Sequence, residues 1–177
     1  MHRLFVAIRP PEPIRDLLID AMDDSADFRW QNEEQLHLTL RFIGEVERPV
    51  ANDLADALSR VRSEPFELRM AGVGRFEQRS SGALWAGVVP KAPVAALAAK
   101  VERTCVEVGL EPERRAFHPH VTLARWKGRR TREVAAFLEH ARALSSEPFA
   151  VTDFKLFESR LSRHGAHYEE VASYPLG

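Results

Sequence analysis

The chain has 177 residues and a single cysteine, and this scarcity limits how its fold can be held together. One thiol can neither form an internal disulfide nor supply a cysteine-based structural zinc site. Cys105 stands at helical spacing with Val101 and Val108, so we expect it to be a buried structural thiol. The fold must therefore rest on an ordinary hydrophobic core, which 45% apolar residues can supply.

Long apolar runs are also missing. No stretch approaches the roughly 20 residues that a membrane-spanning helix needs, and residues 1–3 lead into a strand-like segment rather than a signal peptide. We therefore expect a cytoplasmic protein with no membrane partner. The formal net charge is −1, so the chain lacks the basic excess that grips a long nucleic acid through many phosphates.

A short motif occurs twice in the chain. The tetrad His-Leu-Thr-Leu at 37–40 returns as His-Val-Thr-Leu at 120–123, 83 positions later. Flanking blocks recur in the same order at offsets of 80 to 83: 4–10 with 84–90, 63–66 with 146–149, 76–79 with 157–160, and 82–85 with 165–168. We interpret the chain as one two-lobed domain, 1–177, built by internal duplication of halves at about 1–80 and 81–177.

Apolar patterns predict the same order of elements in each half: strand, helix, motif strand, helix, strand. Besides the motif strands, we expect strands at 4–8, 66–73, 83–89, 149–157 and 166–171, and helices at 14–22, 54–61, 94–108 and 134–141. Adjacent strands between helices favour an α+β fold over a purely parallel sheet. Since equivalent surfaces pair about a two-fold axis, we predict a bilobal, pseudo-two-fold α/β sandwich whose antiparallel sheets line a central cleft.

Strand alternation indicates which side chains of a tetrad face the same way. In the first copy, His37 and Thr39 share one face, whereas Leu38, Leu40 and Phe42 share the other. The second copy divides in the same manner. Each copy can therefore bury an apolar row and display a polar row of one histidine and one threonine.

Two displayed imidazoles suit acid–base chemistry on a phosphate, because histidine exchanges a proton near neutral pH. One ring would accept a proton from attacking water, and the other would protonate the departing oxygen. The hydroxyls of Thr39 and Thr122 would donate to the non-bridging oxygens. Attacking and leaving oxygens stand in line on opposite sides of phosphorus, which matches two catalysts related by a two-fold axis. The scheme needs no metal and no cofactor.

Positive charge is concentrated around the second tetrad. The cationic residues there are Arg114, Arg115, Arg125, Lys127, Arg129, Arg130 and Arg132. A basic collar of this kind suits a small anionic ligand or the end of a chain. The alternative interpretation is a solvated loop and helix start that happen to be rich in arginine.

These motifs resemble the two-histidine phosphoesterase superfamily, and within it the RNA 2′,3′-cyclic phosphodiesterases, also called 2′-5′ RNA ligases. The resemblance extends over nearly the whole length, through residues 3–8, Trp30, residues 36–46, residues 117–125, and the closing spacing of Ser159, Leu161, Gly165 and Tyr168. It implies a bilobal fold with a central cleft. It also implies metal-independent hydrolysis of a terminal 2′,3′-cyclic phosphate to a 2′-phosphate, with weak reverse joining to a 2′-5′ linkage.

The resemblance also implies roles for individual residues. His37 would be the general acid that protonates the ribose 3′ oxygen, and His120 the general base that activates water. Near-symmetry leaves these two roles exchangeable on sequence grounds. Thr39 and Thr122 would hold the phosphate oxygens. Arg125 corresponds to a functional arginine of the family, although strict alternation from His120 turns it to the opposite face.

Phe42 stands at the same +5 position after His37 as Arg125 does after His120. A matched β-bulge would turn both side chains toward the cleft, where they would sandwich a base by stacking and cation–π contact. The alternative is that Phe42 is a core residue. The expected partners are RNA 3′ ends or nucleotides that bear a 2′,3′-cyclic phosphate, bound by a monomer.

Two other functions fit part of the pattern. A metal-dependent phosphohydrolase would use His118 and His120 on one strand face, with His37 as a third ligand. Against this, no Asp or Glu stands at a ligand-like spacing beside either tetrad, and the threonines would have no role. The second alternative is a binding module that recognises phosphorylated ends without turnover, although intact His and Thr in both copies argue against lost chemistry.

Overall fold

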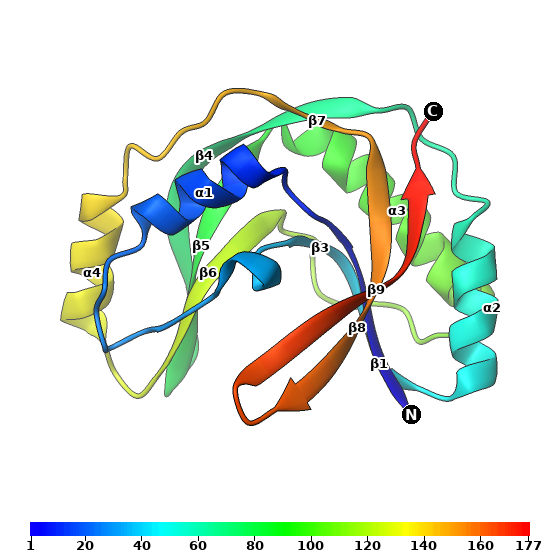
Figure 1. Cartoon of the computed structure of the whole chain (residues 1–177), viewed down its shortest axis with the longest axis horizontal. Coiled ribbons are helices and arrows are strands. Elements are labelled where there is room, and N and C mark those ends of the chain that lie inside the picture. Colours follow the sequence, from blue (N-terminus) through cyan, green and yellow to red (C-terminus); the bar gives the residue numbers. More distant parts are fainter.

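The computed structural model describes residues 1–177 as one curled antiparallel sheet with four α-helices (Figure 1). The strands are β1 (His2–Ile8), β2 (Arg29–Trp30), β3 (Leu38–Val46), β4 (Phe66–Glu77), β5 (Ser81–Val89), β6 (His120–Lys127), β7 (Phe149–Val151), β8 (Asp153–Ser162) and β9 (Gly165–Pro175). The helices are α1 (Glu12–Ala21), α2 (Arg48–Leu58), α3 (Lys91–Glu107) and α4 (Thr131–His140), with a 3-10 turn η1 (Glu33–Gln35). The predicted α+β class is confirmed.

The sheet consists of two halves that meet at its middle. Its strand order is β7-β4-β5-β6-β3-β1-β8-β9, with β2 also beside β6. A single residue pair, Leu38 with Val121, joins β3 to β6. We call β1, β3, β8 and β9 lobe A, and β4, β5, β6 and β7 lobe B. The bilobal prediction is confirmed, although the expected separate sheets are one continuous sheet whose curl turns the lobes toward each other (Figure 1).

The lobes do not coincide with the two halves of the sequence. β4 pairs with β5 in lobe B, whereas β8 and β9 return from the C-terminal half to extend lobe A beside β1. The pairing between halves repeats the offset of the sequence motif, since Leu38 pairs with Val121 and Glu67 pairs with Ala150, 83 positions apart in both cases. A pseudo-two-fold axis through these two pairs accounts for the exchange, and internal duplication remains our proposal for its origin.

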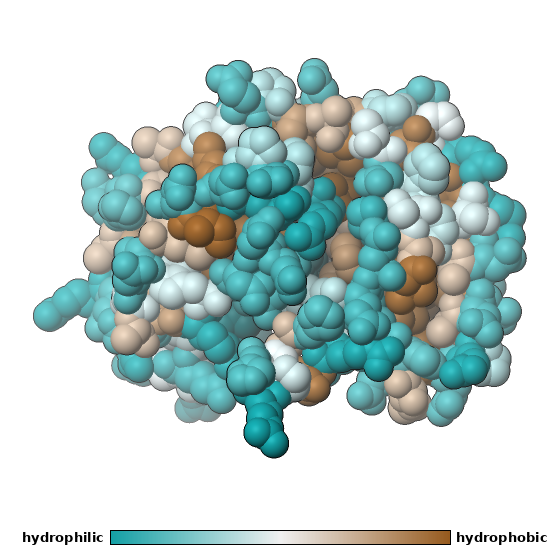
Figure 2. All heavy atoms as spheres, viewed as in Figure 1, coloured by the Kyte–Doolittle hydropathy of each residue, from teal (hydrophilic) through white to brown (hydrophobic).

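One hydrophobic core lies between the α-helices and one face of the sheet. All four helices contribute to it, for example through Leu18, Leu58, Val101 and Phe137, because each carries apolar residues along one side. Cys105 is fully buried there, as predicted. None of the helices combines the length and apolar character needed to cross a membrane. Hydrophilic side chains gather over the middle of the molecule, between the lobes (Figure 2).

Candidate active site

Matched β-bulges interrupt both motif strands just after the tetrad histidine and threonine. The register of β3 against β1 shifts at Leu40, and that of β6 against β5 shifts at Leu123, 83 positions later. A bulge leaves one residue unpaired and turns over the side chains that follow. Phe42 is consequently 42% exposed, and Arg125 is exposed as well. Strict strand alternation predicted a buried Phe42 and an Arg125 on the face opposite to His120, and both expectations were wrong because of the bulges. The predicted matched bulges are confirmed.

The single pair between β3 and β6 fixes where the tetrad side chains lie. Extending its antiparallel register by one residue sets His37 opposite Thr122, and Thr39 opposite His120, on the face turned away from the buried Leu38. We call this the open face. The two histidines are then diagonal neighbours, and the Cα atoms of diagonal neighbours in an antiparallel pair lie about 7–8 Å apart. One phosphate group can bridge that separation with a hydrogen bond to each ring.

Each imidazole is held by the backbone carbonyl two residues before it. Nδ1 of His37 lies 2.7 Å from the oxygen of Gln35, and Nδ1 of His120 lies 2.6 Å from the oxygen of His118. A carbonyl oxygen can only accept a hydrogen bond, so Nδ1–H is the donor in both rings. Nε2 is therefore the atom that each ring offers for proton exchange with a ligand.

Different local structures position the two carbonyls. In lobe A, Asn32 and Gln35 form a capping box around η1, and the Gln35 amide donates to the carbonyl of Ala166 in β9 at 2.9 Å. Before the second tetrad, His118 precedes Pro119, whose ring restricts its neighbour to extended backbone. η1 was not predicted, although an Asn followed by Gln three residues later indicates such a cap.

Aromatic rings also pack against the His37 imidazole. The ring of Phe5 lies 4.7 Å from it, and Tyr168 meets it edge-on at 5.4 Å. Phe157 stacks behind Phe5 at 5.2 Å. These contacts restrict how the imidazole can turn and remove water from one side of it.

His120 has a similar aromatic setting in lobe B. Phe76 meets its ring edge-on at 4.8 Å, while Trp85 lies 6.2 Å away and packs against His118 at 4.8 Å. Gly74 stands directly opposite Trp85 in the β4–β5 pair, and a Cβ at this glycine would lie 2.2 Å from the indole ring. Glycine therefore allows the indole to lie against β4.

These aromatic residues were not among the predicted site residues. They belong, however, to the repeated flanking blocks, where Phe5 aligns with Trp85 and Phe76 aligns with Phe157. Aromatic residues at equivalent positions of both copies were the signal that could have identified them.

Burial lowers the pKa of both imidazoles. Desolvation is the largest cause for His37 and brings its pKa to about 4, with the charges of His120, Arg125 and Arg9 acting in the same direction. The pKa of His120 is also lowered, first by desolvation and then by the charges of His118 and Arg125. The free protein therefore holds both rings neutral at neutral pH. A bound anion would reverse this effect, because negative charge favours the imidazolium form.

The structure does not bring Phe42 and Arg125 together. Both lie four residues beyond the single β3–β6 pair, on strands that run in opposite directions, so they flank the histidines on opposite sides. The predicted sandwich of one base between them is thus not supported. Phe42 has a different cation–π partner, Arg3, whose guanidinium carbon lies 5.4 Å from the ring centroid. Arg125 instead stands opposite Arg29 of β2.

The histidines do not form the cluster that the metal-dependent alternative requires. His118 and His120 are neighbours, with ring centroids 5.8 Å apart. No third His, Cys, Asp or Glu joins them at a distance suitable for a shared metal ion, and His37 does not complete the set. This alternative therefore lacks a ligand set.

Two strands that each present a His-x-Thr motif, and that meet about a pseudo-two-fold axis, define the class of two-histidine phosphoesterases. Within this class, the sequence profile of the 2′-5′ RNA ligase superfamily matches residues 10–163. The chain belongs to this superfamily. The resemblance inferred from the motifs is thereby confirmed.

Individual relatives agree over most of the chain. The RNA 2′,3′-cyclic phosphodiesterase of Aeropyrum pernix is 36% identical over 144 residues, which are 78% of this chain and 81% of that protein. That of Archaeoglobus fulgidus is 31% identical over 176 residues, 96% of this chain and 97% of the relative. The crystal structure of Escherichia coli LigT in apo form has a TM-score of 0.81 and 27% identity, covering 99% of this chain and 97% of LigT.

Proposed function

We propose that the chain is an RNA 2′,3′-cyclic phosphodiesterase, which opens a terminal 2′,3′-cyclic phosphate to a 2′-phosphate without a metal ion and catalyses weak reverse joining to a 2′-5′ linkage. The observation that carries the proposal is the pair of imidazoles, diagonal on one sheet face, with both Nε2 atoms left for a ligand. Relatives named for this activity cover most of the chain. Escherichia coli LigT, which has been crystallised with 3′-AMP, adds support at a TM-score of 0.82.

Each imidazole handles one proton. Nε2 of His120 accepts a proton from water as the water oxygen bonds to phosphorus, and the bond from phosphorus to the ribose 3′ oxygen breaks. Nε2–H of His37 gives its proton to that oxygen, which leaves a 3′-hydroxyl and a 2′-phosphate. His37 must therefore be protonated in the complex. The negative charge of the cyclic phosphate supplies this condition, because it raises the pKa that burial lowers in the free protein.

The remaining site residues have binding roles in this proposal. Thr39 and Thr122 lie diagonally across the same face, and their hydroxyls donate to the non-bridging phosphate oxygens, where charge accumulates. Arg125 supplies positive charge from one side of the histidines. Phe42 offers an exposed ring for stacking a base on the other side.

The substrates in this proposal are nucleotides or RNA 3′ ends that carry a 2′,3′-cyclic phosphate. Both histidines and both threonines come from one chain, so a monomer contains the complete set of proposed catalytic groups.

Product identity tests the proposal. The protein is given 2′,3′-cyclic AMP with excess EDTA, and the two monophosphate isomers are separated by chromatography. We expect 2′-AMP to form at an unchanged rate with EDTA present. Formation of 3′-AMP alone would assign the opposite bond, and turnover that requires an added divalent cation would establish a metal-dependent enzyme. Binding without ring opening would favour the binding module.

A further inference from the structure

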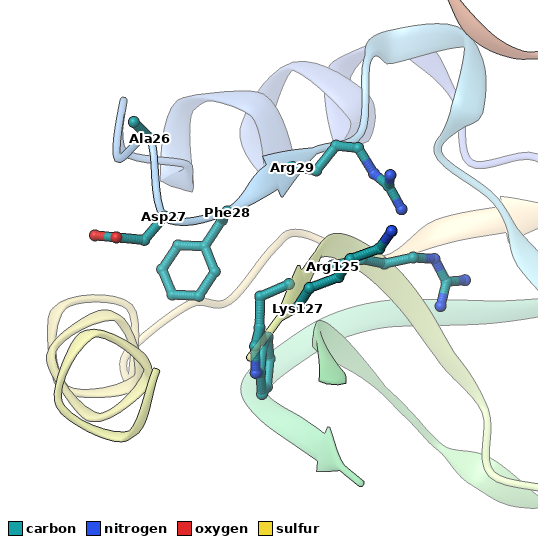
Figure 3. Close-up of a pocket in the computed structure, with 7 residues that line it drawn as sticks. Ala26, Asp27, Phe28, Arg29, Arg125 and Lys127 are labelled. Carbon is teal, nitrogen blue, oxygen red and sulfur yellow. The ribbon is translucent and has the colours of Figure 1, made fainter. Parts of the chain in front are cut away.

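A basic pocket lies beside the proposed catalytic residues. It has a volume of about 390 Å³ and lies between β6 and the segment that ends in β2 (Figure 3). Phe28 and Trp126 are its buried apolar residues. Arg29, Arg125 and Lys127 supply positive charge at its edge, and the charged ends of all three extend toward the same open side in Figure 3.

The arrangement of these three cations is costly for the folded chain alone. Arg29 and Arg125 are directly opposite in the β2–β6 pair, where like charges destabilise a sheet. Lys127 lies two residues beyond Arg125, so strand alternation places it on the same face. The one carboxylate of the pocket, Asp27, instead pairs with Arg130 at 3.5 Å. The three cations consequently have no anionic partner within the chain.

Arg125 connects this pocket to the histidines. It lines the pocket and lies on β6, the strand that begins at His120, and its charge lowers the pKa of both His37 and His120. An anionic strand that leaves the histidines past Arg125 meets Arg29 and Lys127 next. The formal net charge of −1 provides no extended basic surface beyond them. This combination suits a few phosphates near a chain end rather than a long duplex.

We propose that the basic pocket binds the phosphates of the nucleotides that precede the cyclic end of an RNA strand, which makes the protein selective for oligonucleotides over mononucleotides. The proposal rests on the proposed function for the position of the terminal phosphate. Arg29 and Lys127 are its specificity-determining residues, and the phosphates neutralise the repulsion between the opposed arginines.

Binding of a product strand tests this assignment without requiring turnover. The affinity of a fluorescent hexaribonucleotide ending in a 2′-phosphate, and that of 2′-AMP, are measured at several salt concentrations. The variants are Arg29→Gln and Lys127→Gln, and the matched control is Lys91→Gln, which removes the same charge from an exposed position on α3. We expect the hexamer to bind the wild type more tightly than 2′-AMP does. Each pocket variant should weaken hexamer binding and reduce the slope of log affinity against log salt by about 0.7.

Wild-type affinities that are equal for the hexamer and 2′-AMP would overturn the proposal. So would pocket variants whose salt slope matches that of the Lys91→Gln control. Failure of the proposed function would give a different result. If the protein bound the hexamer through the pocket but never opened 2′,3′-cyclic AMP, the pocket assignment would stand and the hydrolase assignment would be wrong.

Discussion

The two histidine sites are alike near the phosphate and different farther out. Both have an Nδ1 held by the carbonyl two residues earlier, a threonine two residues later, aromatic packing and a bulge. Beyond the bulge, lobe A presents Phe42 where lobe B presents Arg125. The shared features are those that proton transfer at one phosphorus atom requires, and the differing ones give the substrate a direction, with a stacking surface at one end and positive charge at the other.

The two motif strands are also supported differently beyond their bulges. In lobe A, Arg41 is 8% exposed, pairs with Glu102 of α3 at 2.8 Å, and donates to the carbonyl of Glu111. The corresponding residue of lobe B is Ala124, which pairs with Trp30 of β2. An ion pair thus connects β3 to α3 in lobe A, whereas backbone pairing connects β6 to the short strand β2 in lobe B.

Removal of either imidazole should have the largest effect, because each ring carries out one of the two proton transfers. His37→Ala and His120→Ala should each lower kcat for 2′,3′-cyclic AMP by about 10²- to 10⁴-fold, with unchanged circular dichroism. A cyclic substrate with bridging sulfur at the 3′ position separates the roles, since a thiolate leaves without a proton. This substrate should restore turnover to His37→Ala and not to His120→Ala. The reverse pattern would make His120 the general acid and His37 the general base.

The threonines test whether the two halves hold the phosphate equally. Thr39→Val and Thr122→Val each remove one hydrogen bond to a charged oxygen, so kcat should fall by roughly 10- to 10²-fold in each variant. Steady-state kinetics with 2′,3′-cyclic AMP measure this loss. An unaffected variant would remove that threonine from the phosphate site.

Gly74→Ala tests the aromatic support of His120. The added Cβ would meet the Trp85 ring at 2.2 Å and displace it toward His118 and His120, so kcat should fall by about tenfold. Gly72→Ala is the control for lost stability, because its positive φ of 77° strains an alanine in the same strand, β4, while the added Cβ would contact nothing within 4 Å. Both variants should lose stability in urea titrations. Equal kcat values for 2′,3′-cyclic AMP in the two variants would argue against a role for Trp85.

The smallest expected effect is the pH dependence of the free energy of unfolding that results from the burial of His37. The folded pKa of about 4 lies below the ordinary 6.5, so the unfolded chain takes up a proton first as the pH falls between these values. Stability should therefore decrease from pH 6.5 toward 4, by at most about 1.4 kcal/mol per pH unit for this group. Urea midpoints should decline less steeply in His37→Asn, and identical slopes would contradict the assigned burial.

The sequence predicted most helices and strands, and the shared face of His37 and His120, because both depend on local pattern. Helix α3 has apolar residues at helical spacing up to its end near Gly109, and the tetrads contain the alternation of a strand. Internal repetition supplied the rest, since two matched copies locate a site that one histidine cannot. The position of Phe42 depended on a bulge, which is set by how β3 pairs with β1 rather than by residues of β3 alone.

Non-local pairing accounts for the other differences. The exchange that places β4 in lobe B and β8 in lobe A follows from strand partners far apart in the sequence. β2 has only two residues, too few for a periodic signal, and is defined by its pairing with β6. The expected strand at 149–157 divides at Thr152 because β7 pairs with β4, whereas β8 pairs with β1 and β9.

The central claim is that one phosphate group contacts both imidazoles. NMR titration of the ring protons of His37 and His120, with and without 2′-AMP, tests it most directly. One equivalent of 2′-AMP should raise the pKa of both rings, because a single dianion lies between them. A response from only one ring, or a second equivalent needed to shift the other, would contradict the account.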